Sequence, residues 1–324
     1  MSLPAPDARR LLAIDVGTQS TRAIVFDERG ETVGVGRAAY EPYRSPRPGW
    51  AEQDARRWRS AALSATAGAI RAAGPLARVL AIGLTGQCPS IVPVDASGEP
   101  VGPGLMYRDN RATAEAAAFV ERFGERGIHR RTGHLPAAFH AGPKMLWLRE
   151  HRPEVFARTA TFLQPRDLAL HALTGELATD GTHAAATLFY ELAAGRWDRE
   201  ILAAFSLDPS LLPPIRASWE VIGEVRPGLR RRLGLRGPVP VVLGGADSQA
   251  CALGAGVVAP GPVSEMAGSS TCLNTAVAAP LARAPSSCRS PRTKSARAAR
   301  SSRRAASPSR SRWTAWPRAR RRSR

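Results

Sequence analysis

Cysteine is scarce in this sequence, and long apolar runs are missing from it. The 324 residues include four cysteines, none in a C-x-x-C pair, namely Cys88, Cys251, Cys272 and Cys288. This pattern argues against the disulfide framework of a secreted protein and favours reduced, cytosolic thiols. The first ten residues lack the apolar core of a signal peptide, and no stretch approaches the ~20 apolar residues of a membrane span. We therefore expect a cytoplasmic protein without a membrane partner.

Two common motifs of metal and nucleotide chemistry are also missing. The six histidines are scattered and show no ligand spacing such as H-E-x-x-H, so a structural metal site is not expected. The sequence contains no G-x-x-x-x-G-K-[ST] loop, which excludes the P-loop kinases. Any Mg²⁺ would then arrive together with a nucleotide.

Acidic residues are absent from the stretch 283–324. This stretch holds 15 of the 46 Lys and Arg residues, so the remaining chain has 31 basic against 27 acidic residues and carries only +4 of the net charge of +19. It also contains no Leu, Ile, Val or Phe and cannot build a core, which predicts disorder. One interpretation is a nucleic-acid arm, in which arginines neutralise phosphates and Trp313 and Trp316 stack on bases. We favour a frameshift product, because recognisable pattern stops near Pro280 and gives way to Arg-rich sequence.

The segment 14–27 reads as two short apolar strands joined by a small, hydroxyl-rich turn. Such a turn is suited to holding phosphate, because a glycine lets the backbone approach an anion and hydroxyls stand beside backbone N–H groups. The residues expected to contribute are Gly17, Thr18, Ser20, Thr21 and Arg22. Asp15, at the end of the first strand, is expected to hold Mg²⁺ through water. The alternative is an ordinary β-hairpin whose turn is polar because most turns are.

Two later segments repeat this arrangement of a strand followed by small polar residues. A buried-strand run at 241–243 leads through two glycines to Asp247 and then to a small-residue helix. Further on, a strand leads to the turn Gly268, Ser269, Ser270 and Thr271. The chain thus has three polar turns, each next to a strand.

Together these segments resemble the FGGY family of carbohydrate kinases, which belongs to the actin-like ATPase superfold, with a xylulokinase-like pattern. Further matching stretches are 85–87, 107–111, 173–176, 179–180 and 184–187, and the resemblance covers roughly residues 10–280. It implies an α/β fold of the actin-like (ribonuclease H-like) type, with a mixed sheet flanked by helices and a second, similar domain largely missing. It also implies that the turn from Asp15 to Arg22 grips the ATP phosphates, that Asp247 is the general base, and that the turn from Gly268 to Thr271 meets the γ-phosphate.

The chemistry of phosphoryl transfer is consistent with this set, because it depends on alignment, a metal and neutralised charge. A sugar hydroxyl is a poor nucleophile at neutral pH, so a carboxylate such as Asp247 must accept its proton as attack proceeds. ATP and Mg²⁺ are the expected cofactors. The alternative for Asp247 is an N-cap on the helix that starts near Ser248.

Substrate contacts are predicted at the carboxyl end of the sheet, where ligands of open α/β sheets usually lie. Gln87 directly follows a predicted strand, and Arg108 and Asp109 belong to a stretch rich in donors and acceptors that suits a polyol. With Asp247 they form the expected substrate-binding set. The alternative is that Asp109 or Asn110 caps the next helix while the arginines of this stretch are solvated.

Residues 140–220 are expected to be mainly helical and to cap the sugar end of the cleft. Lys144, in a segment that packs a core face, either approaches a ligand or, as we favour, is a solvated lysine in the first turn of a helix. The role of Asp180 is left open between ligand contact and structure.

The expected secondary structure describes an α/β lobe. Strands are predicted over 11–15, 21–26, 32–40 and 79–84, a helix over 51–73, and a hairpin from 90–94 with its turn at 95–98. Hairpin strands followed by a helix and another strand indicate a sheet flanked by helices. The predicted domains are a sugar-binding domain over 1–240, the start of a nucleotide-binding domain over 241–282, and the tail over 283–324.

The predicted function is ATP-dependent phosphorylation of a sugar or polyol, with a ketopentose such as xylulose as first candidate. A sugar-binding remnant without catalysis is the alternative, and nucleic-acid binding through the tail is a less favoured third. A chaperone-type ATPase or an acetate kinase would share the phosphate turns but lack Gln87 and the 107–111 stretch. We expect the protein to bind a small-molecule substrate and to form a homodimer.

Overall fold

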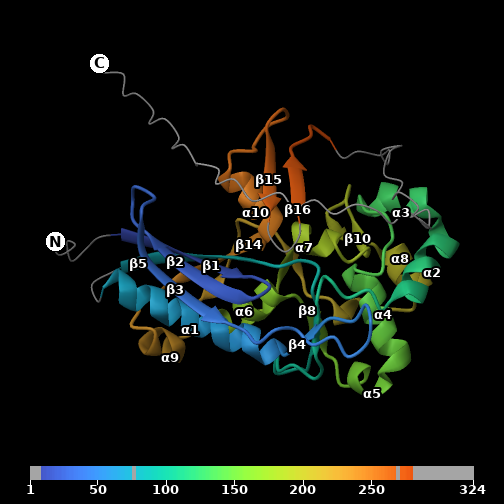
Figure 1. Ribbon diagram of the computed structural model, residues 1–324, viewed down its shortest axis with the longest axis horizontal. Coiled ribbons are helices and arrows are strands. Elements are labelled where there is room, and N and C mark those ends of the chain that lie inside the picture. The colour runs from blue at the N-terminus through green and yellow to red at the C-terminus, as the bar shows by residue number, and fades with distance from the viewer. Residues whose placement is uncertain (1–8, 75–77, 268–270, 280–324) are drawn as a thin grey trace, which may run out of the picture. The chain divides into compact units, whose positions relative to one another are not determined.

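The computed structural model describes residues 9–74, 78–267 and 271–279 (Figure 1). The turn residues Gly268, Ser269 and Ser270 and the tail 283–324 lie outside the described residues, so the predictions made for them stay predictions. Within the described part, no helix combines the length and apolar character needed to cross a membrane.

A six-stranded mixed sheet, in the order β13-β14-β5-β1-β2-β3, is the central element. Its strands are β1 (Arg9–Val16), β2 (Ser20–Phe26), β3 (Thr32–Ala39), β5 (Arg78–Gly86), β13 (Val221–Glu224) and β14 (Pro240–Ala246). β2 lies antiparallel to β1 and β3, whereas β5 lies parallel to both β1 and β14. The four strands predicted up to residue 84 are confirmed, with small shifts at their ends.

The three parallel strands end in register at one edge of the sheet. Val16 at the end of β1 pairs with Gly86 of β5, and Gly86 pairs with Ala246 of β14. Residues that end or follow these strands are therefore brought together, although they are more than two hundred positions apart in sequence. This edge positions the candidate site.

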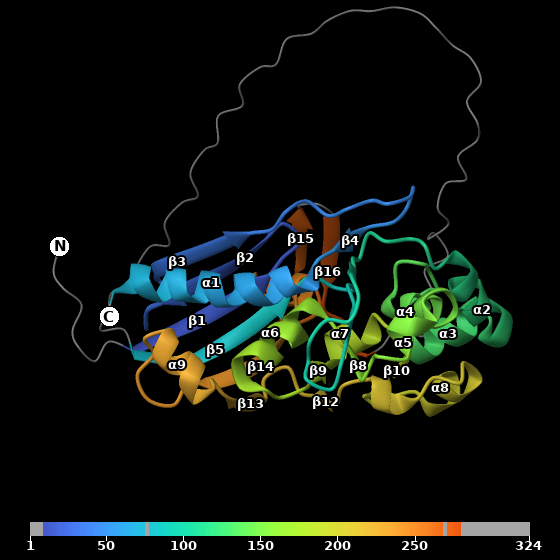
Figure 2. The same cartoon turned by 90° about the horizontal axis from the view of Figure 1, so that it is seen from below.

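One face of the sheet is covered by helices α1 (Ala55–Ala73) and α6 (Pro165–Thr174), as Figure 2 shows. α1 packs closely on β3, because glycines face the small alanines of the helix. A Cβ on Gly36 would lie only 1.9 Å from the carbonyl oxygen of Ala65. The helix predicted over 51–73 starts later than expected, since Asp54 accepts a hydrogen bond from the N–H of Arg56 and caps it.

Side chains of β1 alternate between the two faces of the sheet. Leu12, Ile14 and Val16 are buried in the core beneath the helices. Asp15 lies on the opposite face and is only partly covered. The strand that builds the core thus also presents a carboxylate near its end.

A second hydrophobic cluster lies among the helices that follow the sheet strands. The helices outside the sheet layer are α2 (Thr113–Phe123), α3 (Glu125–Thr132), α4 (Ala141–His151), α5 (Pro153–Phe156), α7 (Gly181–Ala185), α8 (Arg199–Ala204) and the 3₁₀ helix η1 (Pro209–Leu211). Helix α9 (Pro227–Arg232) instead packs against the sheet's own cluster through Leu229. Between the helices run the short strands β4 (Glu52–Gln53), β6 (Val92–Val94), β7 (Gly104–Leu105), β8 (Thr161–Leu163), β9 (Thr179–Asp180), β10 (Tyr190–Glu191), β11 (Arg196–Trp197) and β12 (Ile215–Arg216). Residues 140–220 are therefore helical with short strands between the helices.

The hairpin predicted at 90–98 forms, although its ladder is short. The Asp95 carboxylate accepts from the N–H groups of Ser97 and Glu99, and Val94 bridges to Pro100 across the turn. The sequence did not predict that β6 also pairs antiparallel with β8. The distant strand β8 provides the longer ladder.

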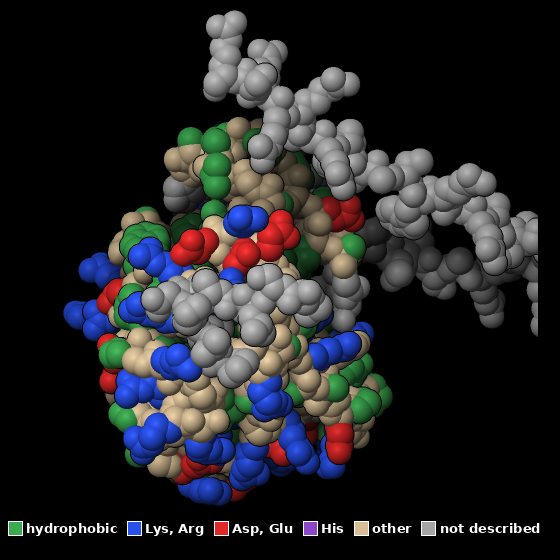
Figure 3. All heavy atoms as spheres, turned by 90° about the vertical axis from the view of Figure 1, so that its left-hand side faces the viewer, with side chains coloured by type: hydrophobic (Ala, Val, Ile, Leu, Met, Phe, Trp, Pro, Cys, Tyr) green, Lys and Arg blue, Asp and Glu red, His purple; other side chains and the backbone are tan. Residues whose placement is uncertain are grey.

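The segment after residue 240 begins within the central sheet. β14 pairs with β5, and is followed by α10 (Asp247–Gly254) and the hairpin of β15 (Val263–Ala267) and β16 (Thr271–Thr275), both packed against α10. The predicted division at residue 240 separates β14 from the strand with which it pairs. We propose a boundary after α10 instead. On the face shown in Figure 3, Lys and Arg side chains are interspersed with acidic and apolar ones, in keeping with the modest net charge outside the tail.

Candidate active site

Asp15 and Asp247 lie close together at the carboxyl edge of the sheet. Burial raises the pKa of Asp15 to about 6, the Asp247 carboxylate contributes to the rise, and Arg22 opposes it. Burial also raises the pKa of Asp247, against a 2.7 Å hydrogen bond that its Oδ1 accepts from the N–H of Ser248. The structure therefore brings together the two carboxylates that the sequence singled out.

The alternative for Asp247, an N-cap, is wrong. Asp247 is the first residue of α10, and Ala246 occupies the capping position without a side-chain cap. The preceding strand β14 has a bulge at Gly244. Only glycine fits there, because its φ is 72° and a Cβ atom would lie 1.6 Å from the carbonyl oxygen of Leu84. Asp247 is thus free of a capping role.

A cation would fit beside Asp15. Its Oδ1 is buried and, within the described structure, makes no hydrogen bond. No group of three or more His, Cys, Asp or Glu residues is arranged for a metal in the part of the chain that the structure describes. A cation here would take most ligands from water or a bound phosphate, which suits Mg²⁺.

The side chains of the predicted phosphate turn differ in their availability. Ser20 Oγ accepts from Arg37 Nε at 3.2 Å, and the Thr21 hydroxyl bonds to that of Tyr40; both residues are buried. Thr18 and Gly17 are half-buried at the turn itself, whereas Arg22 is exposed and pairs across the strands with Asp15. The backbone of the turn, Thr18 and Arg22 are therefore more accessible to a phosphate than the hydroxyls of Ser20 and Thr21, which are already hydrogen-bonded.

Gln87 links the phosphate turn to the neighbouring loops. This residue is 1% exposed; its Nε2 donates to the Gly17 oxygen at 3.1 Å, and its Oε1 accepts from Ser90 Oγ at 2.9 Å. Ser90 Oγ in turn accepts from the N–H of Tyr107. Both ends of the Gln87 amide are therefore already bonded, and its predicted sugar contact stays a prediction.

Asp109 is held by the protein itself. It is fully buried, accepts from the N–H of Ala51 at 2.6 Å, and pairs with Arg111 Nη2 at 2.7 Å. The alternative interpretation is wrong for the helix cap, since α2 has Ala112 at its N-cap, and wrong for Arg111, whose side chain is only 2% exposed. It is confirmed for Arg108. Arg108 is exposed, with its guanidinium over the ring of Tyr43.

Lys144 is fully buried, so the solvated interpretation is wrong. Its Nζ donates to the carbonyl oxygens of Pro89 at 3.0 Å and Met106 at 2.7 Å. Burial lowers the pKa of Lys144 to about 7, although the nearby Asp109 counteracts this. Lys144 therefore clamps two loops near the site and does not point into solvent.

A buried polar cluster around Asp180 was missed by sequence reasoning. Asp180 Oδ1 accepts from Arg166 Nη2 and faces His183 Nδ1, both at 2.8 Å, while Oδ2 accepts from the hydroxyls of Thr182 and Ser218. Burial alone would raise the pKa of Asp180, but these partners lower it below its ordinary value. The sequence pointed to Asp180 itself, through the 179–180 stretch of the family resemblance, but nothing in the sequence connects Arg166 or Ser218 to it.

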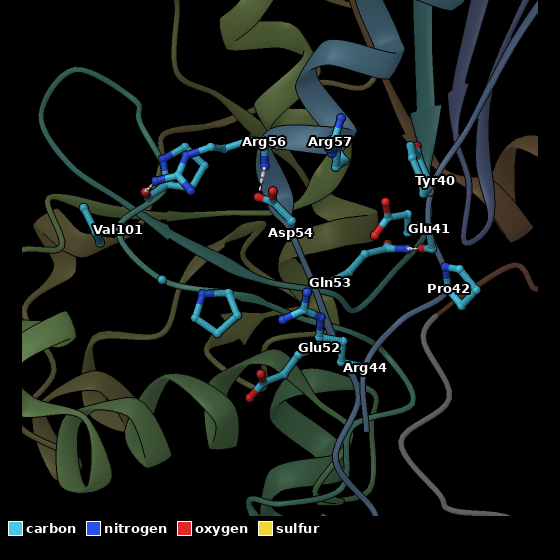
Figure 4. Close-up of a pocket in the computed structure, with 13 residues that line it drawn as sticks. Tyr40, Glu41, Pro42, Arg44, Glu52, Gln53, Asp54, Arg56, Arg57 and Val101 are labelled. Atoms are coloured by element: carbon cyan, nitrogen blue, oxygen red, sulfur yellow. Dashed lines mark hydrogen bonds between the residues drawn. The ribbon is translucent and has the colours of Figure 1, made fainter. Parts of the chain in front are cut away.

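Two cavities border these residues. One, of about 510 Å³, lies beside Asp247 and is lined by residues 88–89, by parts of 134–140 and 181–192, and by Ser218, Ser248 and Gln249. The other, of about 460 Å³, is shown in Figure 4 and contacts the phosphate turn through Tyr40 and Gln53. The first adjoins the catalytic candidates, and we take it as the substrate cavity.

Comparison with known proteins identifies relatives over most of the chain. Residues 10–254 match the FGGY family of carbohydrate kinases, N-terminal domain. The chain is 32% identical over 249 residues to a xylulose kinase of Lactococcus lactis, which covers 76% of this chain and 49% of that protein. It is 33% identical over 259 residues to a glycerol kinase of Nocardia farcinica, covering 78% and 50%. The chain spans about half the length of the curated relatives it matches.

The fold is shared with solved structures. The xylulose kinase from Rhodospirillum rubrum is 32% identical, with a TM-score of 0.75 over 79% of this chain and 52% of that one. The corresponding kinase from Brucella ovis is 31% identical, with a TM-score of 0.76 over 82% and 54%. The predicted α/β fold, with its mixed sheet flanked by helices, is confirmed.

Proposed function

Because this chain belongs to the FGGY family of carbohydrate kinases, we propose that it carries the substrate side of an ATP-dependent phosphorylation of a sugar or polyol hydroxyl. The observation that supports the proposal most directly is the approach of Asp15 to Asp247 beside a cavity of about 510 Å³. One carboxylate lies at the phosphate turn, and the other directly precedes Ser248, which lines the substrate cavity. This is the arrangement that an attacking hydroxyl and a transferred phosphoryl group require.

In the proposed mechanism Asp247 accepts the proton of the attacking hydroxyl. Its Oδ1 is held by the N–H of Ser248, which fixes the carboxylate at the start of α10. The second oxygen is then the one that faces the substrate hydroxyl. Burial raises the pKa of Asp247, which makes the carboxylate a better base than an exposed one.

The nucleotide is proposed to bind at the turn from Asp15 to Arg22. The backbone at Gly17, the hydroxyl of Thr18 and the charge of Arg22 are available for phosphate oxygens. The turn from Gly268 to Thr271 completes the nucleotide site in this proposal. Mg²⁺ held at Asp15 would supply positive charge to the transferring phosphate.

A ketopentose such as xylulose is the proposed substrate, supported by the xylulose kinases among the relatives. Gln87, Arg108 and Asp109 stay predictions as sugar contacts. We also propose a cytoplasmic location, and the homodimer stays a prediction.

The test is an assay of ADP release across a panel of sugars and polyols, together with calorimetric titration of the same compounds. Asp247→Asn should lower turnover by at least about 100-fold while leaving the dissociation constant for sugar within about threefold, because only proton transfer is removed. Normal turnover in a folded Asp247→Asn protein would refute the general-base assignment. Sugar binding without turnover in the wild type would favour the non-catalytic sugar binder.

A further inference from the structure

The backbone that leads to Asp247 is interrupted by the bulge in β14. The register between β14 and β5 shifts between Val242 and Gly245, so regular strand pairing does not continue unbroken to the end of β14. Ala246, the last residue of β14, directly precedes Asp247 at the start of α10. A displacement of this backbone would therefore displace the carboxylate that follows it.

Side chains from three other elements hold this backbone in place of the regular ladder. The three hydrogen bonds run from Thr85 in β5 to the Gly245 oxygen at 2.8 Å, from Arg166 in α6 to the Leu243 oxygen at 2.9 Å, and from the Ala246 N–H to Thr182 Oγ1 in α7 at 2.8 Å. The bond to Thr182 is the closest to the site along the chain, because Ala246 is the residue before Asp247.

Asp180 fixes the direction of the Thr182 hydrogen bonds. Its Oδ2 lies 2.8 Å from Thr182 Oγ1, and its Oδ1 pairs with Arg166 Nη2 at 2.8 Å. Burial would raise the pKa of Asp180, but His183 and Arg166 lower it below its ordinary value, so the ionised carboxylate can only accept. The single hydrogen of the Thr182 hydroxyl therefore points at Asp180, and its oxygen is left to accept from the N–H of Ala246.

Thr182 is itself held firmly at this position. Its own N–H donates to Asp180 Oδ2 at 3.0 Å, and Asp180 is fully buried and caps α7. β14 passes close to the hydroxyl, since a Cβ on Gly245 would lie 3.3 Å from Thr182 Oγ1. The hydroxyl thus connects a buried ion pair to the backbone in front of Asp247.

We propose that Thr182 is a positioning residue for Asp247, which holds the N–H of Ala246 and thereby the start of α10. The proposal rests on the proposed function, which makes Asp247 the general base. A base must lie within about 2.6–3.2 Å of the hydroxyl that it deprotonates, and a misplacement of about 1 Å can cost about 100-fold in rate. Loss of the Thr182 hydroxyl should therefore slow proton transfer without weakening substrate binding.

The experiment compares Thr182→Val with Thr182→Ser in the full chain, by ADP release and by calorimetric titration with D-xylulose. Thr182→Val keeps the shape but removes the hydroxyl, and should lower turnover by at least about tenfold while the dissociation constant for D-xylulose stays within about threefold. Thr182→Ser keeps the hydroxyl and should restore turnover to within about threefold of the wild type. Thr182→Ala, which adds no methyl group beside the Ala246 N–H, should behave as Thr182→Val.

Thr187→Val is the matched control. Thr187 is also buried, and its hydroxyl likewise accepts from a backbone N–H, that of Phe189 at 3.0 Å, while it donates to the Ala184 oxygen at 2.7 Å. Both bonds stay within its own loop. The control removes the same kind of bridging hydroxyl and should leave turnover within about threefold of the wild type.

A second measurement reads the hydrogen bond itself and does not depend on turnover. Amide hydrogen exchange over residues 244–248 should be faster at Ala246 by at least about tenfold in Thr182→Val, because this N–H has lost its acceptor. Exchange at Ala246 should be unchanged in Thr182→Ser and in Thr187→Val.

The outcomes separate this inference from the proposed function. Wild-type turnover or unchanged exchange at Ala246 in Thr182→Val would overturn the positioning role and leave the kinase proposal standing. A loss confined to D-xylulose binding would also overturn it, and would make Thr182, which lines the cavity, a substrate contact. If the wild type turns over no sugar, the proposed function fails; faster exchange in Thr182→Val then still supports the hold on the backbone before Asp247, and unchanged exchange overturns it.

Discussion

The buried carboxylate of Asp15 works against folding at neutral pH. Its pKa is about 6 in the folded protein, compared with an ordinary value of 3.8. Between these two values the folded state holds the extra proton, so the free energy of unfolding decreases as pH rises through this range and stays lower above it. The charged Asp15 carboxylate, proposed to hold the cation, therefore lowers the free energy of unfolding at neutral pH.

We therefore predict that Asp15→Asn stabilises the protein at pH 7, by up to about 3 kcal/mol, because a neutral amide replaces a charge that burial and Asp247 disfavour. The decrease in stability between about pH 4 and 6 should become shallower in this variant. Urea unfolding at a series of pH values measures both effects. Glu28→Gln, which removes an exposed carboxylate at the next turn, is the control and should change little. A less stable Asp15→Asn protein at pH 7 would contradict this account.

The sequence could predict which site residues lie together when those residues stand at the ends of strands. Asp15 and Asp247 each follow a run of apolar residues, and strand ends of a parallel sheet meet at one edge. Lys144 was misassigned because its sequence neighbours do not reveal that two carbonyl oxygens from other loops enclose its Nζ. Ser218 could not be found at all, since its hydroxyl matters only through the distant Asp180.

The packing of α1 on β3 requires glycine. A Cβ at Gly36 would stand 1.9 Å from the oxygen of Ala65 and 2.5 Å from the nitrogen of Ala69, both backbone atoms that cannot yield without moving the helix. This close approach lets a helix with a mostly alanine face bury itself on the sheet. The packed pair supports β1 and β2, between which the phosphate turn lies.

Gly36→Ala should therefore lower the free energy of unfolding by about 3 kcal/mol or more, because α1 must move away from the sheet. Gly83→Ala, in strand β5 of the same sheet, is the matched control, since a Cβ there meets no atom within 4 Å. Chemical denaturation of the two variants measures the difference. Equal stabilities would show that α1 tolerates displacement.

Elements with a strong local pattern were predicted well, and those that depend on distant partners were not. The strands around the phosphate turn and the long helix α1 follow from alternation and helical spacing. The partner of β6 could not be predicted, because β8 lies more than sixty residues later and is three residues long. The place of β14 in the six-stranded sheet could not be predicted either, because it depends on pairing with the distant strand β5.

The whole described part contains two hydrophobic clusters, one beneath the sheet and the other among the helices α2, α3, α4 and α8. Arg111 lies against the second cluster. Its guanidinium pairs with Glu52 and Asp109 and lies 3.7 Å from the ring centre of Trp50 and 4.8 Å from that of Trp147. The resemblance pointed to this stretch for a ligand, but the side chains here bind one another.

We predict that Arg111→Leu destabilises the protein by about 3–5 kcal/mol, because it leaves the fully buried Asp109 without its cation and removes two cation–π contacts. The loss should exceed that of Arg108→Leu, which removes an exposed guanidinium three residues earlier and should cost less than about 1 kcal/mol. Thermal and urea unfolding followed by tryptophan fluorescence would report the change, since Trp50 and Trp147 lie against Arg111. Equal losses of stability in the two variants would show that the buried ion pair and the ring contacts of Arg111 do not stabilise the fold.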